Sequence, residues 1–105
     1  MDKIKTLKTS ELPLNSSKVV NLGDKPIALF NYEGEYYALD DICSHAEASL
    51  SEGDVYDCKV ECPLHGAEFD LKTGEAVTLP ATQSVNTYKT EIIDGYIYLE
   101  MGTDA

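Results

Sequence analysis

Cys43-Ser44-His45 and, sixteen residues later, Cys62-Pro63-Leu64-His65 are the two stretches that decide how this chain is interpreted. Together they hold both histidines of the sequence and two of its three cysteines. Thiolates and imidazoles are soft or borderline donors that bind transition metals. Such groups in two short matching clusters are improbable by chance. The pattern predicts a metal centre whose ligands are Cys43, His45, Cys62 and His65.

Two kinds of centre use two cysteines and two histidines. In a Rieske [2Fe–2S] centre, two histidines replace two cysteines on one of the irons. Zinc also accepts a Cys2His2 set, but zinc fingers separate paired ligands by two or more residues. Only Ser44 separates Cys43 from His45. The spacing therefore favours one [2Fe–2S] cluster, with a zinc-stabilised interaction module as an alternative.

The residues around the second cluster suit iron and sulfur. Pro63 fixes φ between two ligands, and Gly66 allows the backbone to pass close to the metal. Leu64, Ala67 and Phe69 offer apolar cover against water. The sequence thus predicts a shielded centre rather than an open one.

Nearly the whole chain resembles one protein family. The matching stretches are Cys43-Ser-His45, Cys62-Pro-Leu-His65-Gly66, Phe69-Asp70, Thr73-Gly74-Glu75 and Leu79-Pro80-Ala81. They resemble the Rieske ferredoxins of bacterial aromatic-ring dioxygenase systems, of the biphenyl and carbazole type. The resemblance implies an all-β Rieske fold in a single domain, 1–105. Its antiparallel β-sandwich base would carry a small cluster-binding subdomain of two loops, inserted at about 42–69.

The resemblance also implies roles for the ligands. Cys43 and Cys62 would hold the inner iron, and His45 and His65 the outer iron near the surface. A third loop, around Pro80, would cover the cluster from the side. We therefore expect the cluster-binding and metal residues to be these four and no residue to be catalytic.

The function implied is that of a one-electron carrier. It would pass electrons from an NAD(P)H-dependent flavin reductase to a terminal aromatic-ring dioxygenase, and would act as a monomer. An oxygenase needs a further site of two histidines and one carboxylate, and this chain has no histidine left for it. A Rieske-like small subunit of a nitrite reductase is another alternative, although that family usually lacks the ligand set.

The resemblance further implies a low reduction potential. High-potential Rieske proteins carry an extra cysteine in each ligand loop, where this chain has Ala48 and Leu64. They also place serine and tyrosine hydroxyls against the cluster sulfurs, where Ala67 and Phe69 stand here. Without these groups, and with an acidic chain around the cluster, we expect a potential of about −150 mV.

Sequence periodicity predicts the strands. Turn signals recur every eight to twelve residues between β-branched and aromatic stretches, which is typical of an all-β sandwich or barrel. The clearest hairpin joins alternating residues 88–93 to 96–99 through Asp94-Gly95. A helical turn is expected near 10–13, and the tyrosines are expected in the core and on the sheets. The other expected strands lie near 4–6, 18–22, 26–31, 36–39, 54–56, 59–61 and 68–70.

Composition narrows the partners and the compartment. The chain has 19 acidic residues, 8 lysines and no arginine, giving a net charge of −11. This excludes nucleic acid and anionic membranes as natural partners. No apolar run approaches a ~20-residue membrane span, and residues 1–8 have no apolar signal core. We expect a cytoplasmic protein, where thiols stay reduced.

Several residues remain outside the cluster assignment. Cys58 is interpreted as a passive thiol in or near a strand. The acidic pairs Asp40-Asp41 and Glu52/Asp54 are interpreted as solvated loop carboxylates or turn formers. Glu47 and Glu68 are candidates to meet a basic rim on the oxygenase.

Overall fold

The computed structural model describes residues 3–22, 25–42, 49–63, 67–77 and 85–100. Within these residues the chain forms strands and two short 3-10 turns. No helix among them is long and apolar enough to cross a membrane. In chain order the elements are β1 (Lys3–Lys8), η1 (Thr9–Glu11), β2 (Ser16–Leu22), β3 (Lys25–Tyr32), β4 (Glu35–Asp40), η2 (Leu50–Glu52), β5 (Asp54–Tyr56), β6 (Lys59–Glu61), β7 (Glu68–Asp70), β8 (Thr87–Ile93) and β9 (Tyr96–Glu100).

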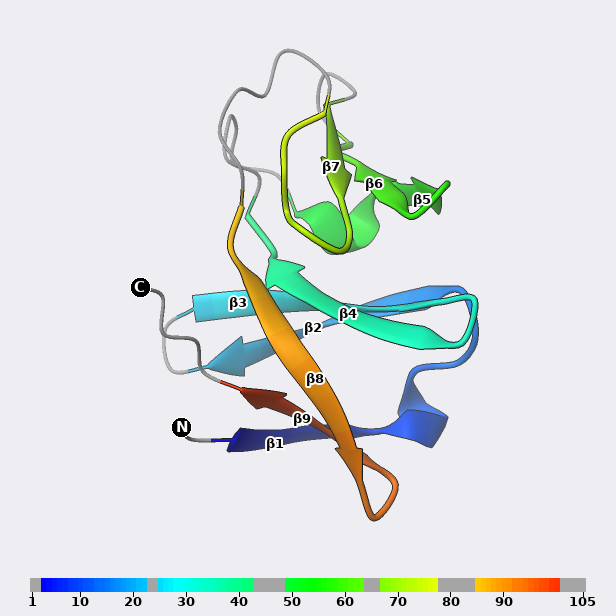
Figure 1. Cartoon of the computed structure of the whole chain (residues 1–105), viewed down its shortest axis with the longest axis vertical. Helices are drawn as coiled ribbons and strands as arrows, with labels where there is room; N and C mark the ends of the chain where they lie inside the picture. Colours follow the sequence, from blue (N-terminus) through cyan, green and yellow to red (C-terminus); the bar gives the residue numbers. More distant parts are fainter. Residues whose placement is uncertain (1–2, 23–24, 43–48, 64–66, 78–84, 101–105) are drawn as a thin grey trace.

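The larger sheet has the strand order β1-β9-β8-β4-β3-β2, with antiparallel pairing throughout. Strand β8 belongs to two layers: its first residues, Thr87 and Tyr88, pair with β4, and residues 89–93 pair with β9. In Figure 1, β8 runs from the layer of β2, β3 and β4 down to the β8–β9 hairpin. The predicted antiparallel sandwich is therefore confirmed, and its two layers are continuous through one strand.

The smaller sheet, β5-β6-β7, lies in the chain between β4 and β8. We call the described residues between these two strands the small lobe. Figure 1 shows it at the opposite end of the molecule from the β8–β9 hairpin. The predicted boundary at about 42–69 stays a prediction, and Leu71, Ala76 and Val85 beyond it pack on the same core.

Strand β3 explains why the two lobes form one unit. Side chains of a strand alternate between the two faces of a sheet. Ile27 and Leu29 enter the core inside the sandwich, whereas Ala28 and Phe30 face a second core shared with the small lobe. All four are at most 1% exposed. A strand buried on both faces thus joins the base to the small lobe.

The described turns follow backbone conformation closely. Asp94 and Gly95 have φ of 51° and 80° and join β8 to β9 in the predicted two-residue turn. Asp57 and Cys58 have φ of 52° and 59° and join β5 to β6. L-residues pay a steric cost at positive φ, and no glycine marks this second turn, so its left-handed backbone could not be predicted although the strands on both sides were.

Candidate metal centre

Cys62 is the predicted ligand that lies among the described residues. It follows β6 directly and is 1% exposed. Its backbone N–H donates to the carbonyl of Ala67 at 2.6 Å, which closes the base of the segment 63–66. The other three predicted ligands, Cys43, His45 and His65, lie outside the described residues, as does Pro80.

The segment that carries Cys43 and His45 is closed in a similar way. Ile42 forms an antiparallel bridge with Ser49. Next to it, the N–H of Leu50 donates to the carbonyl of Asp41 at 2.7 Å. The described residues on either side of 43–48 therefore lie next to each other.

The bases of both ligand segments meet in one apolar core. Leu50 lies after the first segment, and Cys62 and Ala67 flank the second; all three belong to the core under β3. The side chain of Phe69 is fully buried in the same cluster. The arrangement brings together the anchors of two segments that are about twenty residues apart in sequence.

This setting suits a [2Fe–2S] cluster. Such clusters use cysteine thiolates as donors, and the thiol of Cys62 is buried next to Ala67, where it could hold an iron. Apolar surroundings restrict water and help to set the potential of a metal site. The described part of the centre therefore fits the predicted cofactor.

Gly53 brings η2 against the strand that leads to Cys62. A Cβ atom at position 53 would lie 1.9 Å from the carbonyl oxygen of Glu61, far inside contact distance. Only a glycine permits this approach. A cavity of about 200 Å³ beside it is lined by Glu52, Gly53, Asp54, Glu61, Cys62 and Pro63. Acidic residues therefore line a cavity next to the buried Cys62.

Glu68 is more enclosed than a docking residue should be. Its side chain is 15% exposed, and its carboxylate lies 4.0 Å from Lys59 Nζ. It also accepts a hydrogen bond from the hydroxyl of Tyr56. That bond stabilises the protonated phenol and raises the pKa of Tyr56 to about 12. Glu52 and Asp54 are exposed, by contrast.

Cys58 lies in the β5–β6 turn, half-buried against the core under β3. Burial, together with its contacts to Glu35 and Cys58, raises the pKa of Tyr37. The Cys58 side chain thus packs between a core and a phenol. Its interpretation as a passive thiol stays a prediction.

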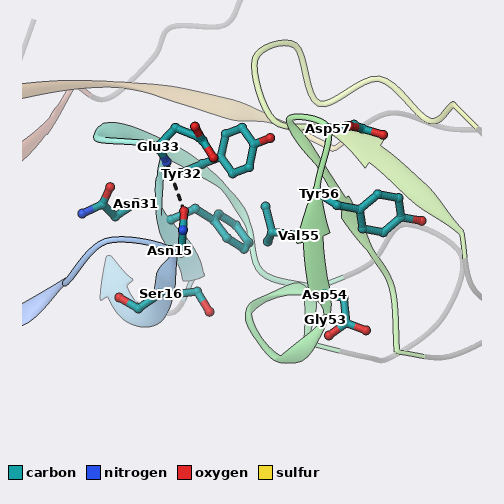
Figure 2. A pocket seen from close by; sticks show the side chains of 12 residues that line it. Asn15, Ser16, Asn31, Tyr32, Glu33, Gly53, Asp54, Val55, Tyr56 and Asp57 are labelled. Carbon is teal, nitrogen blue, oxygen red and sulfur yellow. Dashed lines mark hydrogen bonds between the residues drawn. The ribbon is translucent and has the colours of Figure 1, made fainter.

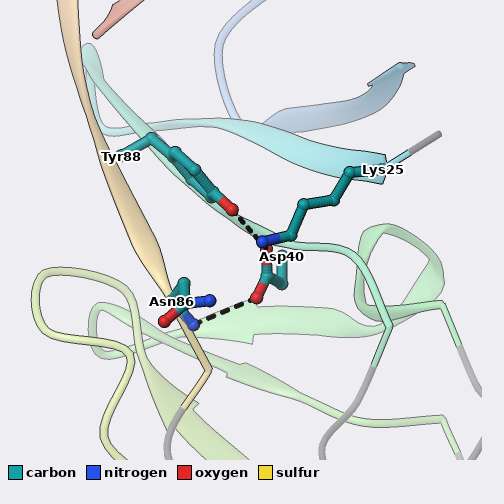
Figure 3. Close-up of polar contacts among 4 residues, drawn as sticks. All are labelled: Lys25, Asp40, Asn86 and Tyr88. Carbon is teal, nitrogen blue, oxygen red and sulfur yellow. Dashed lines mark hydrogen bonds and ion pairs between the residues drawn. The ribbon is translucent and has the colours of Figure 1, made fainter. Parts of the chain in front are cut away.

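The expectation that Asp40 and Asp41 are merely solvated is wrong. Asp40 links the residues that precede the small lobe to those that follow it. Its N–H donates to the Asn86 carbonyl at 3.0 Å, and its carboxylate accepts from the Asn86 N–H at 3.3 Å. The Tyr88 hydroxyl donates to the same carboxylate at 2.6 Å, and Lys25 Nζ lies 3.4 Å away (Figure 3). Burial and the bond to Asp40 raise the pKa of Tyr88.

A larger groove, of about 700 Å³, shares Gly53 and Asp54 with the cavity beside Cys62, but Cys62 itself does not line it. Figure 2 shows it between the β3–β4 turn, with Asn15 and Ser16 beside it, and the strand β5. Its walls come from residues 15–17, 30–33 and 53–57. In Figure 2, Asp54, Tyr56 and Asp57 lie on the β5 side of this groove.

Comparison with known proteins identifies the family. The profile described as "Rieske [2Fe-2S] domain" matches residues 2–89. The chain belongs to the Rieske [2Fe–2S] domain family. Its cofactor is therefore one [2Fe–2S] cluster, and the zinc-module alternative falls away.

Individual relatives indicate the kind of Rieske protein. The chain is 47% identical, over 90% of both sequences, to the 3-phenylpropionate/cinnamic acid dioxygenase ferredoxin subunit of Photorhabdus laumondii. A ferredoxin of Sphingomonas yanoikuyae B1 is 27% identical, with a TM-score of 0.89 over 96% of this chain and 100% of that one. These relatives are ferredoxins, and this Rieske chain is an electron carrier rather than an oxygenase.

A third relative comes from a structure described as a complex of reduced oxygenase and oxidized ferredoxin in carbazole 1,9a-dioxygenase. One of its chains is 32% identical, with a TM-score of 0.86 over 92% of this chain and 91% of that one. The predicted resemblance to ferredoxins of the carbazole and biphenyl type is confirmed.

Gly53→Ala should disturb the centre. The added methyl group must displace the Glu61 carbonyl, and with it the backbone that leads into Cys62. We expect the purified variant to hold markedly less cluster than the wild-type chain, measured as visible absorbance per protein.

Gly95→Ala is the matched control. Its φ of +80° makes any side chain strained, yet the space around it is open. The variant should lose about 1–2 kcal/mol of folding free energy and keep its full cluster content. Equal cluster content in both variants would contradict the role given to the Gly53–Glu61 contact.

Proposed function

We propose that this ferredoxin holds its cluster through Cys43, His45, Cys62 and His65. We further propose that it carries electrons singly from an NAD(P)H-dependent flavin reductase to the terminal oxygenase of an aromatic-ring dioxygenase system. When bound, the cluster supplies the one-electron redox chemistry. The observation that carries the proposal is the buried thiol of Cys62, set where the bases of both ligand segments meet. The names of the ferredoxin relatives support the choice of system.

The remaining alternative, a nitrite reductase small subunit, is less well supported. It would require that the Cys-His pairs serve no cluster, although they are complete in this sequence. The curated relatives at 47–53% identity are named as dioxygenase ferredoxin subunits. A carrier needs no catalytic acid or base of its own.

The ligand assignment predicts that some single substitutions abolish the cluster and that others leave it intact. Cys62→Ala and His65→Ala should abolish the cluster, because each opens a coordination position. Cys58→Ser should retain it, since Cys58 lies in the β5–β6 turn and packs on the core. Visible absorption and iron content of the purified variants measure this. A colourless Cys58→Ser chain that remains folded would show that a ligand is misassigned.

Charge is unevenly distributed, and this bears on docking. From Asp41 to Asn86 the sequence has nine acidic residues and two lysines, which is −7 of the total −11. Opposite charge on a partner accelerates encounter and orients it. We propose that the small lobe faces a basic rim on the oxygenase, and that the exposed Glu52 and Asp54 contribute more than the enclosed Glu68. Glu47 lies outside the described residues and stays a candidate.

Electron transfer to the oxygenase should therefore weaken with salt. With the oxygenase component of a 3-phenylpropionate/cinnamic acid dioxygenase as partner, we expect a several-fold lower second-order rate in 0.3 M than in 0.02 M salt. Glu52→Gln combined with Asp54→Asn should lower the low-salt rate and flatten the salt profile. Stopped-flow mixing of reduced ferredoxin with oxidised oxygenase measures both.

Asp94→Asn is the control for this experiment. It removes one charge at the β8–β9 turn, far from the small lobe (Figure 1), and asparagine tolerates the positive φ there. Its rate should match that of the wild-type chain. A flat wild-type salt profile, with the double variant silent, would leave docking to apolar contacts.

The low potential should respond to hydroxyl groups beside the cluster. Ala67→Ser and Phe69→Tyr each introduce a hydroxyl into the core that contains Cys62. A hydrogen bond to a charged group contributes about 1.5–3 kcal/mol, so each substitution should raise the potential from about −150 mV by roughly 60–130 mV. Redox titration followed by visible absorption tests this, and a wild-type potential well above zero would contradict the explanation.

A further inference from the structure

Asp41 is a buried acid directly after β4, with 4% of its surface exposed. Both carboxylate oxygens accept hydrogen bonds: Oδ2 from the hydroxyl of Ser49 at 2.6 Å, and Oδ1 from the N–H of Ser51 at 2.9 Å. Its backbone carbonyl accepts from the N–H of Leu50 at 2.7 Å. Asp41, which precedes the segment 43–48, therefore binds the three consecutive residues that follow it, 49–51.

The same network reaches the base sheet. The N–H of Asp41 donates to the carbonyl of Pro26 in β3 at 3.1 Å. The hydroxyls of Ser49 and Ser51 lie 2.8 Å apart, and the carbonyl of Ser51 accepts from the hydroxyl of Ser17 in β2 at 2.6 Å. Both ends of the segment are thus tied to β2 and β3 as well as to each other.

The chemistry of this network indicates positioning more than bulk stability. Among the described residues, Asp41 forms no ion pair with a lysine; its partners are neutral donors. Burying an anion with neutral partners is costly, so the network is a poor source of net stability. Charge-assisted hydrogen bonds are short and directional, however. Two of them on one carboxylate fix where the returning chain lies.

We propose that Asp41 is a positioning residue for the cluster. Its carboxylate fixes the separation and direction of the two ends of the segment 43–48, and through them the placement of the ligands Cys43 and His45. This inference rests on the proposed assignment of those two ligands. The positioning acts through the backbone, without contact between Asp41 and the metal being required.

Asp41→Ala tests the proposal, with Asp41→Asn as the conservative variant. The alanine variant loses both acceptors, whereas asparagine keeps one oxygen for the Ser51 N–H. We expect the cluster of Asp41→Ala to bleach at least about tenfold faster than the wild-type cluster in the presence of a chelator, under conditions where all variants stay folded by circular dichroism. Its reduced form should also show shifted or broadened EPR g-values. Asp41→Asn should lie between the two.

Asp40→Ala is the matched control. It removes the same charge one residue away and breaks the contacts to Asn86 and Tyr88. It should lower the thermal midpoint but keep wild-type EPR g-values and bleaching rate. Ser49→Ala removes one hydrogen-bond donor to Asp41, so it should change the bleaching rate and the g-values in the same direction as Asp41→Ala but by less. It replaces Asp41→Ala in the test if that variant does not fold.

The outcomes separate this proposal from the ligand assignment. Wild-type g-values and bleaching in Asp41→Ala, Asp41→Asn and Ser49→Ala would overturn the positioning role alone. Changes of equal size in Asp40→Ala would overturn it too, because the effect would then follow charge or general stability. A wild-type chain with no cluster signal would contradict the ligand assignment and this proposal together.

Discussion

The structure depends on one constraint: the two segments that carry the predicted ligands, 43–48 and 63–66, must each have their ends held together, and both must rest on the same apolar core. Pairing of Ile42 with Ser49 closes the first, and the hydrogen bond from Cys62 to Ala67 closes the second. Strand β3 supplies the surface, since its alternate side chains Ala28 and Phe30 face the small lobe. Backbone pairing thus fixes the distance between the two ends of each segment, and burial in the shared core fixes where these ends lie.

The residues around Cys62 and the charge of the small lobe are suited to an electron carrier. Ala67 and Phe69, which are buried in the same core as Cys62, have apolar side chains without a hydroxyl. The stretch 41–86 is acidic in sequence, and the small lobe that its described part forms lies at the end of the molecule away from the β8–β9 hairpin. A dry centre beneath a charged surface is suited to brief encounters, in which an electron moves and no substrate is bound. Redox partners of this kind use small interfaces.

Much of the fold could be predicted because its signals are local. Neighbouring residues alone predict the hairpin at Asp94-Gly95 and the strands near 54–56, 59–61 and 68–70. The burial of Asp41 was missed because its partners, Ser49 and Ser51, approach only when the intervening segment folds back. The strands on both sides of Asp57 and Cys58 were predicted, but the positive φ of these two residues was not, because no glycine marks it. Within the site, the structure describes Cys62, while Cys43, His45 and His65 rest on their pattern in the sequence.

The most direct test of the central claim is the metal content and spectrum of the chain purified without oxygen. One [2Fe–2S] cluster with mixed ligands requires two irons and two acid-labile sulfides per chain. The protein should be red-brown, and its reduced form should give the EPR signal of a Rieske centre. A colourless protein containing one zinc and no sulfide would contradict the account.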